Sequence, residues 1–511
     1  MFTVADQLRR GLSLVTDDTK RYQLAEEIFL RAGTKAMNST LFSQALVYFR
    51  QGIELLGVDH WITHYQLSLK LYSNCVLTQF VSGETKGLET TAKNVLEHAR
   101  SLPDKLCVYF VLTSSFGVRG MYTTSLSYGF KALSLLGEYF VMQPDPEYVF
   151  AEYRHTNKML SWDTIESISA LPVMEDENKC AAMDFMNVVL PYCHQDGQFQ
   201  LVGALVISRM IRLTLKYGLC KESAVACASF GALSFMKKLT NDSKHGVARA
   251  SQCGRAAVSI VKRLNAREVL PRVYSIVYSY INPIMQPMQA NVESLKIAYD
   301  IALATGNVEY ACEAIASECW LSFFSGSNLA PTIERTRTAL KFMEEIGSKR
   351  MISVCLRPLL QTMLNLHDLS IEGPAELAMH EHVIAFMDGQ GGKIGQSSHK
   401  NFLLMNHYLC AMILSAIFNE NELAVKMFGS YVEAAEQRPN RGMVIVAETF
   451  YKGLVAASAC RLPSQIHKKG QWREIADDAL QTMKLYCNHT LAWNFQSKVE
   501  LLCAEIALID G

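Results

Sequence analysis

Helical periodicity is the sequence feature that most limits the folds open to this chain. Between residues 39 and 57, apolar or small side chains recur at steps of three and four, which marks one face of a helix. These positions are Leu41, Ala45, Tyr48, Phe49, Gly52, Ile53 and Leu56. Residues 22–37 show the same pattern, and Asn38-Ser39 between the two supplies a helix stop and an N-cap. The sequence therefore predicts a helical hairpin over residues 22–57.

Small residues in this hairpin fall where two antiparallel helices must approach closely. Gly33 and Ala36 belong to the first helix, and Ala45 belongs to the second. Phe49 follows one turn after Ala45, and Gly52 follows three residues later. This spacing resembles the tetratricopeptide pattern, although its usual Trp and Pro are missing. The resemblance implies a right-handed superhelical solenoid of antiparallel helix pairs.

The alternation of apolar helix and short break continues along the chain. Further helices are expected at 61–81, 85–100, 105–118 and 122–136, with breaks at Ser82-Gly83, Leu102-Pro103 and Arg119-Gly120. Helices are also expected at 180–193, 199–217, 223–239, 245–264 and 269–281, and onward from 291 to 508. Convincing alternating strands are absent. The predicted fold class is all-α.

Four segments follow from this pattern. Residues 1–21 form a polar N-terminal segment or cap, and 22–140 form a first helical array. Residues 141–178, which carry Pro144, Pro146, Pro172 and an acidic cluster at 175–177, are expected to be an irregular crossing. Residues 179–510 form a second array, continuous with the first. A repeat array of 511 residues is plausible because each unit needs only its neighbours, whereas a single compact core stops growing earlier.

Charge and composition narrow the class of partner and the location. The 49 basic and 49 acidic residues cancel without long runs of either sign, so we expect no binding to nucleic acid or membrane. The most apolar window, 403–418, is shorter than the roughly 20 residues that cross a bilayer and contains Asn406 and His407. The N-terminus has no secretory signal, and the 14 cysteines form no CxxC pair. A cytoplasmic location is expected.

Candidate metal and phosphate sites are weak in this sequence. His60 and His64 lie four residues apart, and His380-Glu381-His382 is a compact cluster, but neither is an HExxH motif. No third or fourth ligand lies at a sequence spacing typical of a metal site. The glycine-rich stretch 389–398 lacks both the GxxxxGK[ST] pattern and a preceding strand. We therefore predict no metal and no cofactor.

Candidate nucleophiles lie inside apolar helical patterns. Cys193-His194 and the pairs Cys220/Cys227 and Cys312/Cys319 lack the positive, partly exposed surroundings that a reactive thiolate needs. No GxSxG occurs, and residues 184–186 (DFM) only imitate a kinase DFG motif. We predict that the chain has no catalytic residues and is not an enzyme.

The stretch 306–326, GNVEYACEAIASECWLSFFSG, predicts a packed inner helix between two glycine stops. Cys312, Ile315 and Cys319 share one face of the expected helix with Ser322, and only Glu309 and Glu313 form a clear polar edge. A helix that is apolar on most sides lies between two neighbours. The two cysteines are expected to fill the core.

The order of motifs resembles the long helical region of large multidomain signalling proteins. In that family a serine/threonine kinase domain and an AAA-type predicted ATPase lie upstream, and GAF and histidine-kinase domains often lie downstream. The resemblance rests on YFRQGIELL at 48–56 with Trp61 and Tyr65, on 98–109, on 215–233, on 278–326 and on the last helix at 493–509. It covers nearly the whole chain, from about residue 22 to residue 508.

The resemblance implies a regulatory arm without catalysis, because the catalytic residues of the family have no matching positions here. We expect a protein-protein interaction scaffold in signalling, either a fragment of an ATPase or kinase signalling protein or an adaptor to one. The expected partners are proteins or peptides, including ATPase or kinase domains. Two alternatives stay open: a small-ligand sensor arm of a regulatory ATPase or histidine-kinase system, and an enzyme with an unrecognised site.

Overall fold

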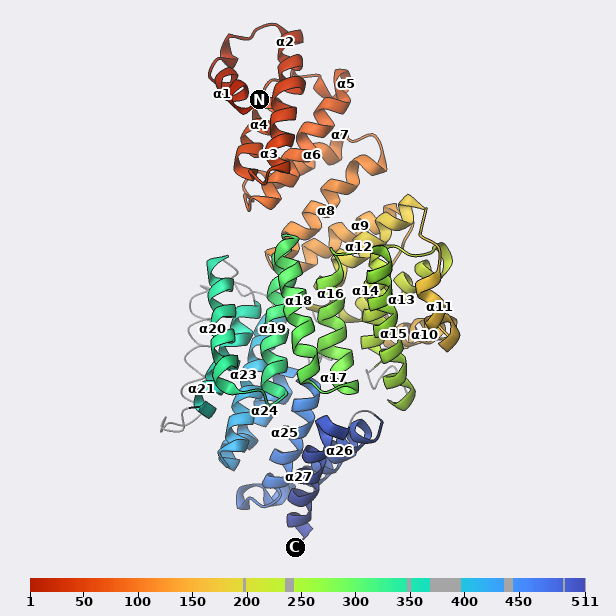
Figure 1. Cartoon of the computed structure of the whole chain (residues 1–511), viewed down its shortest axis with the longest axis vertical. Coiled ribbons are helices and arrows are strands. Elements are labelled where there is room, and N and C mark those ends of the chain that lie inside the picture. Colours follow the sequence, from red (N-terminus) through yellow and green to blue (C-terminus); the bar gives the residue numbers. More distant parts are fainter. Residues whose placement is uncertain are drawn as a thin grey trace. The chain divides into compact units, whose positions relative to one another are not determined.

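The computed structural model describes residues 1–195, 199–234, 243–346, 351–367, 397–435, 444–489 and 492–510. In these ranges every regular element is helical (Figure 1), and the only β-bridge is an isolated one between Val173 and Leu219. The predicted all-α class is confirmed. The chain forms two compact units, Met1–Val141 with Asp184–Cys193, and Met142–Met183 with His194–Gly511. The residue bounds predicted for two repeat arrays stay a prediction, because a compact unit need not be a repeat array.

The first unit is built from helices that follow one another through short turns. They are α1 (Phe2–Arg10), α2 (Asp18–Gln23), the π-helix η2 (Leu24–Leu30), α3 (Arg31–Asn38), α4 (Phe42–Glu54), α5 (His60–Thr63), α6 (Tyr65–Val81), α7 (Leu88–His98), α8 (Leu102–Val118) and α9 (Tyr122–Leu135). The middle of α12 (Glu177–Gln195) completes the unit. Because α2, η2 and α3 are contiguous, they act as the single first helix of the predicted hairpin, and α4 is its second helix.

The small residues of the hairpin lie where the helices approach most closely. A Cβ added to Gly33 would lie 2.5 Å from Cε1 of Phe49, and one added to Gly52 would lie 2.7 Å from Cδ2 of Leu71. Ala36 and Ala45 are fully buried in the same core. The prediction that these positions need small side chains is confirmed.

Two prolines, Pro103 and Pro146, lie at the starts of helices, where the sequence pattern predicted a break and an irregular segment. Pro103 lies in the first turn of α8, where the side chain of Ser101 accepts from the N–H of Asp104, so Leu102-Pro103 is a helix start instead of a break. Pro146 opens α10 (Pro146–Met159) behind the N-cap Asp145, and α11 (Trp162–Ser167) follows. Residues 141–178 are therefore more helical than predicted.

The end of the segment 141–178 pairs through its backbone with Leu219. The N–H of Leu219 donates to the carbonyl of Pro172 (2.7 Å), and the N–H of Met174 donates to the carbonyl of Leu219 (2.8 Å). Gly218 has φ +101°, and a Cβ there would collide with the Pro172 carbonyl oxygen. This turn requires glycine on both counts.

The rest of the second unit consists of helices up to the end of the described chain. They are α13 (Gln200–Tyr217), α14 (Lys221–Leu233), α15 (Ser243–Leu264), α16 (Leu270–Ile276), the π-helix η5 (Val277–Ile281), α17 (Asn282–Met285), α18 (Gln289–Ala304), α19 (Val308–Phe324), α20 (Leu329–Glu345), α21 (Met351–His367), α23 (Ser397–Ile417), α24 (Asn421–Ala435), α25 (Val444–Ala459), α26 (Lys469–His489) and α27 (Ala492–Asp510). Helices that are neighbours in sequence pack together, as in α18 with α19 and α23 with α24.

The last helix also packs against a segment far back in the sequence. Asn494 of α27 is 7% exposed, its Nδ2 donates to the carbonyls of Pro283 (2.8 Å) and Gln286 (2.7 Å), and its Oδ1 accepts from the N–H of Met288 (3.2 Å). Phe495 beside it shares a core cluster with Leu321 of α19. In a strictly linear array each unit contacts only its neighbours, so this contact across 206 positions is a departure from the simplest repeat geometry.

The apolar window 403–418 falls in α23, which is buried in the core of the second unit. Leu409, Met412 and Ile413 are fully buried there, and the polar side chains of Asn406 and His407 are buried too. The expectation of a buried helix is confirmed. Within the ranges given above, no helix combines the length and the apolar character that crossing a bilayer requires.

Candidate functional site

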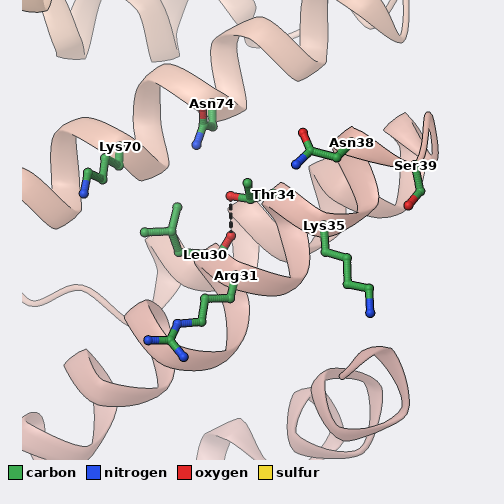
Figure 2. Close-up of a pocket in the computed structure, with 8 residues that line it drawn as sticks. All are labelled: Leu30, Arg31, Thr34, Lys35, Asn38, Ser39, Lys70 and Asn74. Carbon is green, nitrogen blue, oxygen red and sulfur yellow. Dashed lines mark hydrogen bonds between the residues drawn. The ribbon is translucent and has the colours of Figure 1, made fainter.

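A groove between α3 and α6 is the candidate site of the first unit. Both helices pack against α4, and the groove of about 490 Å³ opens between them (Figure 2). Its walls are formed by Leu30, Arg31, Thr34, Lys35, Asn38, Ser39, Lys70 and Asn74. The same packing that buries Ala32, Gly33 and Ala36 against the neighbouring helices turns the polar face of α3 outward.

Helical spacing places the polar residues of the groove in pairs along α3 and α6. Arg31 and Lys35 lie four residues apart on α3, as do Thr34 and Asn38, and Lys70 and Asn74 lie four apart on α6. Residues at this spacing occupy the same side of a helix. The π-helix η2 ends at Leu30, on the wall of the groove, and π-helical segments are common at functional sites.

The charge of the groove is one-sided although the whole chain is neutral. Its walls contain three basic residues and no acidic one, and the side chains of Arg31, Lys35 and Lys70 are exposed. Among the described residues, no carboxylate forms an ion pair with any of the three. The ammonium of Lys35 lies 5.7 Å from the ring centroid of Phe2 in α1, and in Figure 2 the Lys35 side chain extends from α3 away from Lys70 and Asn74. The site therefore favours an anion.

Two carboxamides add directional donors to this positive charge. Asn38 and Asn74 stand on the two helices (Figure 2), and within the described part of the chain neither side chain has a hydrogen-bond partner. Thr34 Oγ1 donates to the carbonyl of Leu30 (2.8 Å), which fixes the hydroxyl at the groove wall. Amide N–H groups beside ammonium and guanidinium groups can bind and orient a carboxylate.

The histidines considered as metal ligands have structural contacts instead. Nδ1 of His60 is hydrogen-bonded to Oγ of Ser68 (2.8 Å), and burial lowers the pKa of His60. The ring of His64 stacks on Tyr22 with 3.6 Å between centroids. No group of three or more His, Cys, Asp or Glu side chains poised for a metal occurs among the described residues. His380-Glu381-His382 and the stretch 389–396 lie outside these residues.

Cys193, Cys227, Cys312 and Cys319 are buried, and Cys220 is half-buried. Cys312 and Cys319 belong to the core cluster of α19 to α25, as predicted, and burial raises the pKa of Cys319 to about 12. Burial likewise raises the pKa of Cys220 to about 12 and the pKa of Cys227 well above its usual value. A nucleophilic cysteine needs the opposite shift. Cys193 and Phe185 are also buried, both in α12.

Sequence reasoning missed the groove because it followed only the apolar faces of the first helices. The usable signal was the polar face, where Thr34 and Asn38 on one helix and Lys70 and Asn74 on another repeat a spacing of four. Glu318 was also missed: it is 2% exposed within the stretch 306–326, and its carboxylate binds Arg335 through Nε (2.9 Å) and Nη2 (2.7 Å).

Comparison of the chain with models of protein families gives no match, and comparison with curated proteins gives no relative. The resemblance to the helical region of signalling proteins therefore rests on the motifs quoted above and stays a prediction.

Proposed function

We propose that the chain is a non-catalytic interaction scaffold, and that the groove between α3 and α6 binds an acidic peptide segment of a partner protein. The observation that carries this proposal is a wall with three basic residues and no acidic one, in which two carboxamides have no hydrogen-bond partner among the residues that the structure describes. Charge complementarity of this kind selects partners and speeds their association. The motif resemblance adds a signalling role, with ATPase or kinase domains among the candidate partners.

An extended peptide suits this groove better than a small molecule. A small-molecule site encloses most of its ligand, whereas this groove is open along the two helices. Its three basic groups lie on two helices, so a chain with acidic side chains or a terminal carboxylate can engage several of them at once. A tetratricopeptide-like packing of the first unit, in which such grooves lie between successive hairpins, is part of the same proposal.

Fluorescence anisotropy with a labelled peptide rich in Asp and Glu tests the proposal, with the matching Asn and Gln peptide as the neutral control. We expect the full chain to bind the acidic peptide at least tenfold more tightly, and we expect added salt to weaken that binding. Lys70→Glu and Asn74→Ala should each weaken binding at least about fivefold, because one reverses a charge and the other removes a donor.

Lys86→Glu provides the matched control, since Lys86 is exposed in the same unit and lies outside the groove. Its affinity for the acidic peptide should stay within twofold of the native value. Equal binding of the acidic and neutral peptides, or native affinity in Lys70→Glu, would show that the groove is not the docking site.

A further inference from the structure

A second polar cavity lies within the second unit, between α15 and the turn formed by η5 and α17. Its volume is about 350 Å³, which is at the lower end of the range for metabolite sites. Arg255, Ser259 and Lys262 of α15 face Tyr278, Asn282 and Gln286 across it. Its walls hold two basic residues and no acidic one. The cavity is therefore separate from the groove of the first unit but favours the same sign of ligand charge.

The donors of this cavity suit a ligand with several anionic oxygens. Arg255 and Lys262 are seven residues apart, which places them about two turns, or roughly 10 Å, apart along one face of α15. Nη1 of Arg255 donates to the hydroxyl of Ser251 (3.1 Å), so part of its guanidinium is already oriented along the wall. Tyr278, Asn282 and Gln286, whose side chains carry a phenol and two carboxamides, also line the cavity. Phosphate oxygens can accept from donors of all these kinds.

One wall of the cavity is also the binding site of the last helix. Asn282 and Gln286 line the cavity, and the carbonyl of Gln286 accepts from Nδ2 of Asn494 in α27. The π-helix η5 leads directly into this turn, and π-helical segments are frequent at functional sites. The turn thus contacts the cavity on one side and Asn494 on the other, so a ligand that binds the turn in its present geometry would also favour the docking of Asn494.

We propose that this cavity binds a small phosphorylated organic anion and that its binding stabilises the docking of α27 on the turn Pro283–Met288. The proposal does not depend on peptide binding by the first unit. It gives the chain a ligand-sensing function in which the readout is the attachment of the last helix. By linkage, a change that weakens the docking of α27 must lower the affinity for the ligand by the same factor by which the ligand strengthens that docking.

The test uses the full chain with ribose 5-phosphate as the probe, and with inorganic phosphate and ribose as the partial probes. Calorimetric titration should show saturable binding of ribose 5-phosphate at least tenfold tighter than binding of either partial probe. The melting temperature should rise with its concentration. Hydrogen exchange should slow in residues 283–288 and 492–510 when the probe is bound.

Charge-reversal variants locate the site. Arg255→Glu and Lys262→Glu should each weaken the binding of ribose 5-phosphate at least tenfold. Arg267→Glu, which changes an exposed residue just beyond α15, should leave that binding unchanged. Arg255→Gln is the milder variant if charge reversal disturbs the fold, with an expected loss of about fivefold. Asn494→Ala should weaken the binding of ribose 5-phosphate severalfold. It should also abolish the slowing of hydrogen exchange that the probe causes in residues 492–510.

Three results would overturn the proposal. They are the absence of saturable binding, binding that Arg255→Glu and Lys262→Glu leave unchanged, and inorganic phosphate that binds as tightly as ribose 5-phosphate. Binding of the acidic peptide, measured in parallel and insensitive to Arg255→Glu, separates failure of this cavity from failure of the groove.

Discussion

Gly33 shows how much of the first hairpin depends on the absence of a single side chain. The ring of Phe49 occupies the space that a Cβ of residue 33 would need, and both residues are buried. Neither the ring nor its neighbours can move away freely, because this part of the core is closely packed. The groove residues of α3 are positioned by this contact, since Gly33 lies between Arg31 and Lys35 on the same helix.

Gly33→Ala should lower the free energy of unfolding of the first unit by about 1–3 kcal/mol, the usual cost of overpacking a core. Urea unfolding followed by circular dichroism measures the change. Gly11→Ala is the control, because a Cβ at Gly11 meets only the carbonyl oxygen of Leu8 at 3.8 Å. A Gly33→Ala protein as stable as the control would mean that the two helices are farther apart than described.

Asp104 links stability to pH at the start of α8. Burial alone would raise the pKa of Asp104, but hydrogen bonds from the hydroxyl of Tyr65 (2.7 Å) and from Ser101 outweigh it, so the pKa is lowered. A carboxyl with a lowered folded-state pKa stabilises the fold above its unfolded pKa of about 3.9, and this stabilisation is lost as pH falls through the folded value.

Asp104→Asn should therefore be less stable than the native chain at pH 7, by about 1 kcal/mol as is typical of helix-cap changes. The difference in urea unfolding should shrink as the pH falls below about 3.9 and should vanish only below the lowered folded-state pKa, because the native carboxyl is then protonated. The same pair of measurements on Asp18→Asn, an exposed position in the first turn of α2, serves for comparison. A difference for Asp104→Asn that is independent of pH would contradict the assigned hydrogen bonds.

At the scale of elements, the apolar pattern predicts which helices are buried, but it does not predict the polar contacts between neighbouring helices. Periodicity predicted α19 as an inner helix, and its Cys312, Ile315 and Cys319 do fill the core. It did not predict that Glu318 would be buried, because a glutamate on a helical wheel looks like a solvent-facing residue. The missing information is the partner: Arg335 comes from α20 and covers the carboxylate while its guanidinium packs 5.1 Å from the ring centroid of Tyr299.

Arg335→Met should destabilise the second unit by about 2–3 kcal/mol, because it leaves the Glu318 carboxylate buried without a partner. The loss is smaller than for a fully buried pair, since the Arg335 side chain is 32% exposed. The double variant Glu318→Gln with Arg335→Met should recover part of it. Arg337→Met, which removes an exposed pair with Glu334 on the same helix, should change stability by less than about 0.5 kcal/mol in the same melting experiments.

At the scale of the whole molecule, the sequence predicted the helical class and most helices, but not which distant helices meet. Local spacing determines the period of a helix and the position of a cap, so the first hairpin and α23 could be predicted. The effect of proline was harder to predict, because Pro103 and Pro146 lie at the starts of helices, where proline was expected to interrupt the helical pattern. The groove and the second cavity each require two elements to face one another, and a single-sequence pattern carries no such information.

The contact between Asn494 and the turn Pro283–Met288 has a consequence for the order in which the protein folds during its synthesis. The carbonyls of Pro283 and Gln286 leave the ribosome more than 200 positions before the side chain that binds them. At about 5–20 residues per second, this turn waits roughly 10–40 s for its partner. During that interval the apolar surface that Phe495 later covers is not yet buried, so we expect the nascent second unit to be prone to aggregation until α27 has been made.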